Sequence, residues 1–270
     1  MSSVLVISDV HHRFREAETW IQRLAGRHDR VVFLGDYFDS HGGDDGPEEI
    51  AATAAWLRDS LARPERTHLV GNHDLSYLVP GDFTACSGDS SEKRDALAPF
   101  LADPVLGALE PATMVNGWLL THAGVHRQLI ARIGADQVLP LIQDQWRNLL
   151  AAGTPPLFAC GYSRGGSSPF GGITWQDFDE FRPTPGLHQI FAHTPANTVR
   201  VHWMIPDRRH ILKRSHQLDR APKEIVDRRA ASSVNICTDT GLRSVVLIAP
   251  DRVTLFADTL PQGEQVIVQH

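Results

Sequence analysis

One pattern recurs three times between Val4 and Asp74, and it constrains the fold more than any other feature of the chain. A short apolar run ends in acidic or histidine residues at the point where the chain turns. The runs and their polar ends are Val4–Ile7 with Asp9 and His11, Val31–Leu34 with Asp36 and Asp39, and His68–Val70 with Asn72, His73 and Asp74. Short buried runs bounded by turn residues predict strands.

Helical patterns separate these runs. One extends from about Arg15 to Leu24, and a second begins at Pro47 and Glu48, where proline and acid suit a helix start. Strands that alternate with helices predict a largely parallel sheet, and ligands bind beyond the carboxyl ends of such strands. We therefore expect the three polar clusters to form one site.

The rest of the chain is less regular. We expect a loop over residues 81–95, helices over 92–102 and 125–151, and a long loop from Gly153 to Gly172. Trp118–Leu120 and Gln189–Ala192 read as further strands, and they too end in polar residues, His122 and His193. The later strands are predicted to form a second, mixed or antiparallel sheet packed on the first: Val199–Trp203, Ile211–Lys213, Val234–Ile236, Ser244–Ile248 and Val253–Ala257.

Composition narrows the class of protein. A length of 270 residues with no clear linker predicts a single α/β domain over 1–270. The net charge of -6 gives no strong nucleic-acid signal, since binding to the phosphate backbone needs an excess of Lys and Arg. The three cysteines lie far apart, no signal peptide is apparent, and no run approaches the ~20 apolar residues of a membrane span. We therefore expect a cytoplasmic protein without a membrane segment.

The residue types at the strand ends indicate metal chemistry. Carboxylate, imidazole and amide groups suit Mn, Fe, Zn, Mg or Co. Hydrolysis of a phosphate ester needs charge neutralisation on the phosphoryl oxygens, an activated water and help for the leaving oxygen. Two metal ions roughly 3.5–4 Å apart supply the first two, and one carboxylate must bridge them.

The order of the motifs resembles the calcineurin-like metallophosphoesterases. The motifs are Asp9-x-His11, Gly35-Asp36-x-x-Asp39, Gly71-Asn72-His73-Asp74 and two later single histidines, His122 and His193. The segments around Trp175 and Asp239 look most like the bacterial phosphoprotein-phosphatase branch. The resemblance implies a metallophosphoesterase fold: two mixed β-sheets packed face to face and flanked by helices.

The resemblance also implies roles for the residues. Asp9 and His11 would bind the first of two divalent metal ions, Asp36 would bridge both, and Asn72, His122 and His193 would bind the second. The ions would be Mn, Fe, Zn or a mixture. A metal-activated water would be the nucleophile, His73 would protonate the leaving oxygen as general acid, and Asp39 would orient His73.

Two departures from the branch concern substrate binding. The phosphate-clamp arginines of that branch are replaced by Ser40 and by Leu75–Tyr77. Arg164, the only basic residue of the loop 161–172, is therefore predicted to bind a phosphoryl oxygen in their place. His12, His41 and Trp175 are further candidates for substrate binding, although each has a plain structural reading as an exposed histidine or a core aromatic.

Three functions remain open at this point. The first is a phosphomonoesterase acting on a phosphorylated small molecule, a nucleotide or a phosphoprotein. The second is a dinucleoside polyphosphate hydrolase, in which Trp175 and the Gly/Ser loop form a wall for the base. The third is a binding module that kept the fold and lost catalysis, which the complete set of candidate ligands argues against. The patterns predict no oligomeric state.

Overall fold

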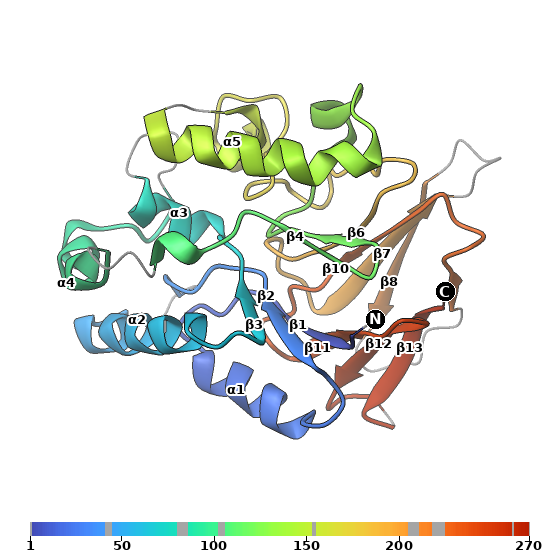
Figure 1. Cartoon of the computed structure of the whole chain (residues 1–270), viewed down its shortest axis with the longest axis horizontal. Coiled ribbons are helices and arrows are strands. Elements are labelled where there is room, and N and C mark those ends of the chain that lie inside the picture. The colour runs from blue at the N-terminus through green and yellow to red at the C-terminus, as the bar shows by residue number, and fades with distance from the viewer. Residues whose placement is uncertain are drawn as a thin grey trace.

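The computed structural model contains two mixed β-sheets that pack together, with helices on their outer faces (Figure 1). It describes residues 2–40, 45–79, 86–101, 106–152, 155–204, 211–217, 225–260 and 262–269. The predicted fold class is confirmed. Among the described residues, no helix is long and apolar enough to span a membrane.

The first sheet carries the three recurring strands. Its order is β3-β2-β1-β11-β12-β13-β9, and β1, β2 and β3 are parallel neighbours. The strands are β1 (Val4–Ile7), β2 (Arg30–Phe33), β3 (Arg66–His68), β9 (Val226–Asp227), β11 (Ser244–Ile248), β12 (Arg252–Ala257) and β13 (Glu264–Gln269). The predicted parallel core of this sheet is thus present, and antiparallel strands extend it beyond β1.

The second sheet has the order β4-β5-β6-β10-β7-β8. Its strands are β4 (Thr113–Val115), β5 (Trp118–Leu120), β6 (His188–Phe191), β7 (Thr198–Met204), β8 (Ile211–Gln217) and β10 (Ser233–Cys237). Strands β5 and β6 are parallel, so His122 and His193, which follow them, leave the sheet on the same edge.

One expectation about the later strands is wrong. They do not all belong to one sheet. Strands β7, β8 and β10 lie in the second sheet with β4, β5 and β6, whereas β11 and β12 extend the first sheet. All five residues of β11 are buried, and they pair with β1 on one side and β12 on the other. A strand buried on both faces belongs in the middle of a covered sheet, and sequence pattern alone does not say which sheet that is.

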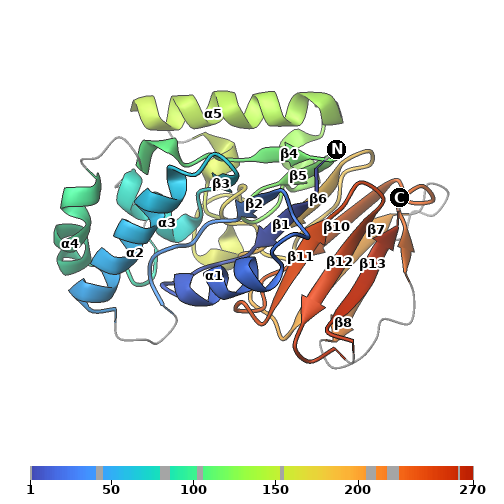
Figure 2. The same cartoon turned by 60° about the horizontal axis from the view of Figure 1, so that its bottom comes forward.

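Helices cover part of the outer face of each sheet (Figure 1, Figure 2). On the first sheet lie α1 (Phe14–Arg23) and α2 (Pro47–Leu61), and on the second lies α5 (Val138–Ala152). The buried residues Ile142, Trp146 and Leu149 are spaced by four and three, so one face of α5 packs on the core. Two further helices, α3 (Asn72–Leu78) and α4 (Ser91–Leu101), lie beside α2 at one end.

One helix boundary differs from expectation: the predicted helix over 125–151 begins only at Val138. The predicted helix over 92–102 is present as α4, and its start at Ser91 shortens the predicted loop over 81–95. Residues 81–85 of that loop and residue 102 lie outside the described residues. Short 3-10 helices precede α5 and interrupt the long loop after it: Arg127–Ile130, Ala135–Gln137, Pro156–Phe158 and Tyr162–Arg164, with a further one at Leu106–Ala108. Gly134 directly precedes the 3-10 helix Ala135–Gln137. Glycine is a weak helix former, so it disfavours a continuous α-helix through this position.

Successive side chains of the first sheet point to opposite faces, so they pack into two different parts of the core. Val4, Val6 and Val32 point into the core between the sheets, where they meet Trp118 and Ile236 of the second sheet. Leu5, Ile7 and Phe33 point the other way and pack against α1 and α2. Burial on both faces holds the strand ends rigidly, and these ends carry the polar clusters.

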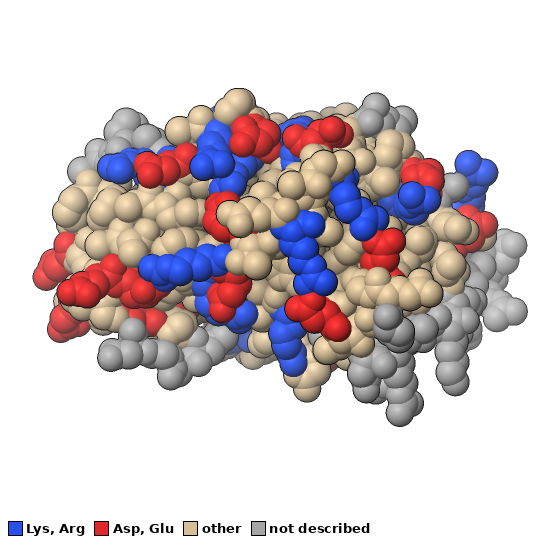
Figure 3. All heavy atoms as spheres, turned by 90° about the horizontal axis from the view of Figure 1, so that it is seen from below, with Lys and Arg blue, Asp and Glu red and all other residues tan. Residues whose placement is uncertain are grey.

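Acidic and basic side chains are interspersed on the face seen from below (Figure 3). Exposed ion pairs such as Arg23 with Asp258 and Arg15 with Glu49 bring opposite charges together on the surface. The described residues of this face therefore form no broad basic patch, which agrees with the weak nucleic-acid signal of the composition.

Candidate metal centre

The polar ends of the strands from both sheets meet in two groups of potential metal ligands that share Asp36. One group is Asp9, His11 and Asp36, and the other is Asp36, His122 and His193. Within each group the ligand atoms lie within 4.8 Å of one another. The structure therefore brings together residues up to 184 positions apart in the chain, as in the contact from the His193 amide to Asp9 Oδ1.

Backbone carbonyls orient two of the histidines. His122 Nδ1 lies 2.9 Å from the carbonyl of Leu34, and His11 Nδ1 contacts the carbonyl of Asp39. A ring nitrogen that donates to a carbonyl leaves the opposite nitrogen, Nε2, as the acceptor. In both rings this Nε2 faces Asp36, at 3.8 Å for His11 and 3.3 Å for His122. Such hydrogen bonds are typical of metal-binding histidines.

The backbone at Gly35 and Asp36 lies so close to the backbone at Gly71 that both glycine positions exclude a side chain. A Cβ at Gly71 would lie 2.0 Å from Asp36 Oδ1, and one at Gly35 would lie 2.4 Å from the Gly71 nitrogen. Asp74 then accepts hydrogen bonds from the backbone nitrogens of Asp36, Tyr37 and Gly71, each at 2.8 Å. The Gly-Asp and Gly-Asn-His motifs are therefore two halves of one rigid turn.

Backbone strain is concentrated at this site. Seven non-glycine residues of the described chain have a positive φ, and five of them belong to the cluster or adjoin it. They are His11, His12, Asp36, Asp39 and His193, with φ between 43° and 68°. Such conformations cost free energy and persist only where the surroundings fix them.

Negative charge accumulates in the buried cluster. Burial raises the pKa of Asp9 well above its usual range, and the charges of Asp239 and Asp36 raise it further. Burial acts in the same direction on Asp36, but the neighbouring His122 and His73 hold its pKa well below the usual range. Carboxylates packed this closely are stabilised by positive charge between them.

The donor atoms fit divalent ions. With its Nδ1 donating to Leu34, the Nε2 lone pair of His122 faces Asn72 Oδ1 at 3.0 Å and His193 Nδ1 at 3.2 Å. Lone pairs that face one another repel unless a proton or a cation lies between them. Burial lowers the pKa of His122, but the Asp36 charge raises it overall to about 9, which shows how strongly the position favours positive charge. The second ring nitrogen of His193 is buried and has no hydrogen-bond partner among the described residues.

His73 and Asp39 lie beside this cluster as a hydrogen-bonded pair. His73 Nδ1 is 3.0 Å from Asp39 Oδ2, and the other oxygen of Asp39 accepts from Tyr77 at 2.7 Å and Lys93 at 2.8 Å. Burial lowers the pKa of His73, but the charge of Asp36 and the bond to Asp39 outweigh it and raise the pKa to about 11. The hydrogen bond to Asp39 therefore favours the protonated form of His73.

A cavity of about 220 Å³ opens onto both features. Its lining includes Asp36, Asn72, His73, His193, Arg164 and Trp175. Arg164 pairs with Asp177 at 2.8 Å and is partly exposed, so its predicted contact with a phosphoryl oxygen is sterically open. Trp175 is only 6% exposed and meets the ring of His193 edge to face, which leaves little of its own face for a substrate.

The two remaining candidates differ in outcome. His12 is buried, with Nδ1 2.9 Å from Thr53 Oγ1 and Nε2 accepting from the Asp39 amide at 3.1 Å. His12 therefore fixes the backbone of Asp39 through this hydrogen bond. Because both of its ring nitrogens have partners and the side chain is buried, the geometry does not favour the predicted contact with substrate. His41 lies outside the described residues.

Sequence reasoning missed three groups at the site. Lys93 and Tyr77 hold Asp39, and Cys86 accepts a hydrogen bond from Asn72 Nδ2 at 3.0 Å. Lys93 and Cys86 follow the Gly-Asn-His turn by many residues, and no local spacing connects them to it. The resemblance to the phosphatase branch points to the segment around Asp239 without giving this residue a role, yet its charge acts on Asp9.

Comparison with known proteins agrees with this geometry. Residues 2–197 match the family model described as calcineurin-like phosphoesterase, so the chain belongs to that family, as predicted. The chain is therefore a metallophosphoesterase with buried Asp and His residues as candidates for its metal site. No curated protein sequence matches the chain.

Solved structures with a similar fold include the cold-active protein-tyrosine phosphatase of a psychrophilic Shewanella species. It is 16% identical, with a TM-score of 0.56 over 99% of this chain and 80% of that one. A mutant of a cold-active protein tyrosine phosphatase gives a TM-score of 0.54 at the same identity and coverage. A metallophosphoesterase from Sphaerobacter thermophilus, also 16% identical, gives 0.46 over 92% of this chain and 83% of that one. The first two show the shared fold.

Proposed function

We propose that the protein hydrolyses phosphate monoesters at a centre of two divalent metal ions, Mn, Fe, Zn or a mixture. Asp9 and His11 would hold one ion, Asn72, His122 and His193 the other, and Asp36 both. When bound, the ions would neutralise the phosphoryl oxygens and activate the attacking water. The observation that carries the proposal is that His73, hydrogen-bonded to Asp39, lines the same cavity as the candidate ligands Asp36, Asn72 and His193.

His73 is the general acid in this proposal. Asp39 fixes the ring through Nδ1, so Nε2 is the atom that delivers the proton to the leaving oxygen. Tyr77 and Lys93 hold the carboxylate of Asp39 in turn. General acid–base groups typically contribute ~10²–10⁴-fold to the rate.

Arg164 is the substrate-binding residue that we assign to the cavity. Its Nε is buried without a hydrogen-bond partner among the described residues, although its Nη2 pairs with Asp177. The side chain as a whole is partly exposed and lines the cavity, which supports the replacement of the missing clamp arginines by Arg164. The cavity suits a phosphoryl group, and the leaving group would extend outward, as a small molecule, a nucleotide or a phosphorylated protein side chain would.

The alternative functions have less support. A dinucleoside polyphosphate hydrolase needs a surface on which a base stacks, and Trp175 is buried against His193. An inactive binding module is expected to lose ligands, and here every candidate ligand reaches the cluster together with His73 and Asp39.

The test uses purified full-length protein stripped with a chelator and reloaded with Mn, Fe or Zn. Each preparation is assayed with p-nitrophenyl phosphate, alkyl phosphates, nucleoside monophosphates, a phosphopeptide and a dinucleoside polyphosphate, with chromatography of the products. We expect two bound ions per chain and release of inorganic phosphate from monoesters. Hydrolysis that persists without bound metal, or confined to the dinucleoside polyphosphate, would overturn the proposal.

A further inference from the structure

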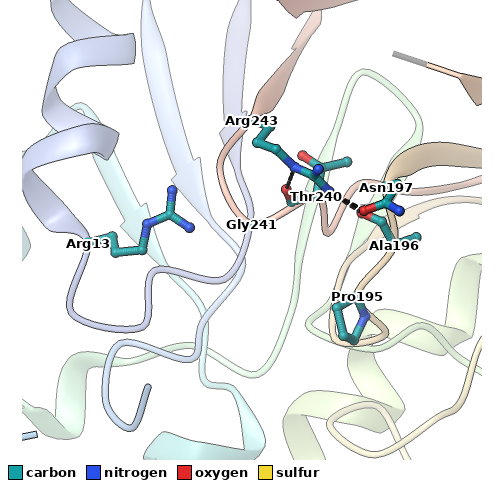
Figure 4. A pocket seen from close by; sticks show the side chains of 7 residues that line it. All are labelled: Arg13, Pro195, Ala196, Asn197, Thr240, Gly241 and Arg243. Atoms are coloured by element: carbon teal, nitrogen blue, oxygen red, sulfur yellow. Dashed lines mark hydrogen bonds between the residues drawn. The ribbon is translucent and has the colours of Figure 1, made fainter. Parts of the chain in front are cut away.

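A second pocket lies next to the candidate metal centre, with a volume of about 580 Å³. Figure 4 shows Arg13 on one side of it and residues 195–197 and 240–243 on the other. Its lining residues are Arg13, Pro195, Ala196, Asn197, Thr240, Gly241 and Arg243. None of them is acidic, and two are arginines.

The pocket borders the cavity of the metal centre. Arg13 follows the candidate ligand His11 by two residues, and Pro195 follows His193 by two residues. Thr240 follows Asp239, whose charge acts on Asp9. Pro195 lines both the pocket and the cavity of the metal centre. A substrate held at the metals therefore has this pocket as an immediate neighbour.

Arg243 forms the fixed side of the pocket. Its Nε donates to the Thr240 carbonyl at 2.8 Å, and its Nη2 donates to the Ala196 carbonyl at 3.0 Å and to Asn197 Oδ1 at 2.9 Å. These bonds tie two loops together and hold the guanidinium in one orientation. They involve neutral oxygens only, so the positive charge of Arg243 is not cancelled.

Arg13 forms the adjustable side. Its Nε pairs with Glu16 at 3.0 Å, and both side chains are substantially exposed, so this ion pair is weak. Its Nη1 lies 3.3 Å from where a Cβ of Gly241 would stand, and Gly241 adopts a φ of +61°. A side chain at position 241 would crowd this nitrogen, which the glycine leaves accessible from the pocket.

We propose that this pocket binds a second phosphate group of the substrate, so the preferred substrates are small molecules with two phosphate groups. The inference rests on the proposed function, which places the first phosphate at the metals. Two guanidinium groups on facing walls, without an acidic residue in the lining, match the charge and the acceptor geometry of a phosphate.

The test compares alkanediol bisphosphates of increasing length with alkyl monophosphates of matching length, on the metal-loaded enzyme. We expect kcat/KM for the best-fitting bisphosphate to exceed that of its monophosphate about tenfold, as a charge-assisted hydrogen bond allows. Arg13→Gln should bring this ratio close to one. Glu16→Gln should raise it, because it removes the acid that competes for Arg13.

Arg252→Gln is the matched control, since Arg252 is also an exposed arginine paired with a neighbouring acid, Asp251. It lies at the far end of β11 and β12 from Ser244, and it should leave the ratio unchanged. A ratio near one for every length in the wild type, or a ratio that Arg13→Gln leaves intact, would refute the subsite.

A binding measurement separates this inference from the proposed function. Alkane bisphosphonates and monophosphonates are not hydrolysed, and calorimetry gives their affinities for the metal-loaded protein whether or not it turns over esters. We expect the bisphosphonate to bind about tenfold more tightly, with the advantage lost in Arg13→Gln. Absence of hydrolysis with this advantage retained would refute only the proposed function, and equal affinities would refute only the subsite.

Discussion

The two walls of the metal-centre cavity are built differently. On one wall, Asp36, Asn72 and His73 are buried in a glycine-dependent turn, and Asp74 accepts three backbone hydrogen bonds behind them. On the other wall, Arg164 extends from a short 3-10 helix in a loop, and its guanidinium is held by Asp177 and a 3.4 Å contact with Thr194.

The difference suggests separate tasks: the first wall carries the residues assigned to the reaction, and the second carries the residue assigned to substrate binding. The first wall tolerates no change of side chain at Gly71 without a clash, so the positions of the candidate ligands and of His73 are fixed by the backbone. The second wall can vary while the first stays intact, because loops that border a rigid scaffold adapt more easily. The predictions below measure how far the two walls act independently.

The largest effect is expected at Asp36, the candidate ligand common to both groups. Asp36→Asn removes the bridging charge, so bound metal should fall from two ions per chain towards none and activity should fall to background. His11→Ala, which affects one group only, should retain about one ion. Elemental analysis with a thermal melt tests this; two retained ions in a folded Asp36→Asn protein would show that Asp36 is not the bridge.

The next effect is at His73, on the same wall. His73→Ala should keep both ions and lower kcat by ~10²–10⁴-fold. The loss should be larger for alkyl phosphates than for p-nitrophenyl phosphate, because a poor leaving group depends more on protonation. His28→Ala, in the segment between α1 and β2, is the control and should have no effect. A loss that is equal for all leaving groups would contradict the role of general acid.

The first wall is also the part that the sequence predicted best. The motifs at Asp9, Asp36 and Asn72 lie at the ends of short apolar runs, and both the motifs and the runs can be recognised from neighbouring residues alone. Because β1, β2 and β3 are parallel neighbours, the three motifs come together at one edge of the sheet. The resemblance to a known family then assigned His122 and His193, which local pattern alone identified only as strand-end residues.

Non-local contacts set the limit of prediction. Nothing near Lys93 in the sequence marks it as a partner of Asp39, which lies 54 residues earlier. The role of His12 depends on Thr53 of α2, and the sheet that β11 joins depends on its pairing with β1. Arg13 and Arg243 come together only because loops from three parts of the chain meet at the metal centre.

On the second wall we expect a smaller effect. Arg164→Ala should lower kcat/KM roughly ten- to a hundredfold, since a charge-assisted hydrogen bond contributes about 1.5–3 kcal/mol. Metal content and the dependence on leaving group should stay close to the wild type, because the hydrogen bond and the ion pair of Arg164 go to Thr194 and Asp177 and not to a candidate ligand or His73. Arg147→Ala, on the exposed face of α5, is the control. A change under about twofold would leave Arg164 as the partner of Asp177 alone.

The smallest effect is expected at Lys93, which connects the first wall to α4. Its Nζ lies 2.8 Å from Asp39 and 2.7 Å from Asp45, and only 15% of the side chain is exposed. Lys93→Met removes one of the hydrogen bonds to Asp39 but leaves those from His73 and Tyr77, so kcat should fall only about tenfold. The loss should show the same dependence on leaving group as His73→Ala, because Lys93 acts through Asp39 on His73.

Lys93→Arg should restore most of the activity, and Glu92→Gln on the neighbouring exposed position should change nothing. If Lys93→Met lowers activity equally for every leaving group, or in proportion to a loss of thermal stability, then Lys93 only attaches α4 to the fold, and the chemistry of the first wall ends at Asp39.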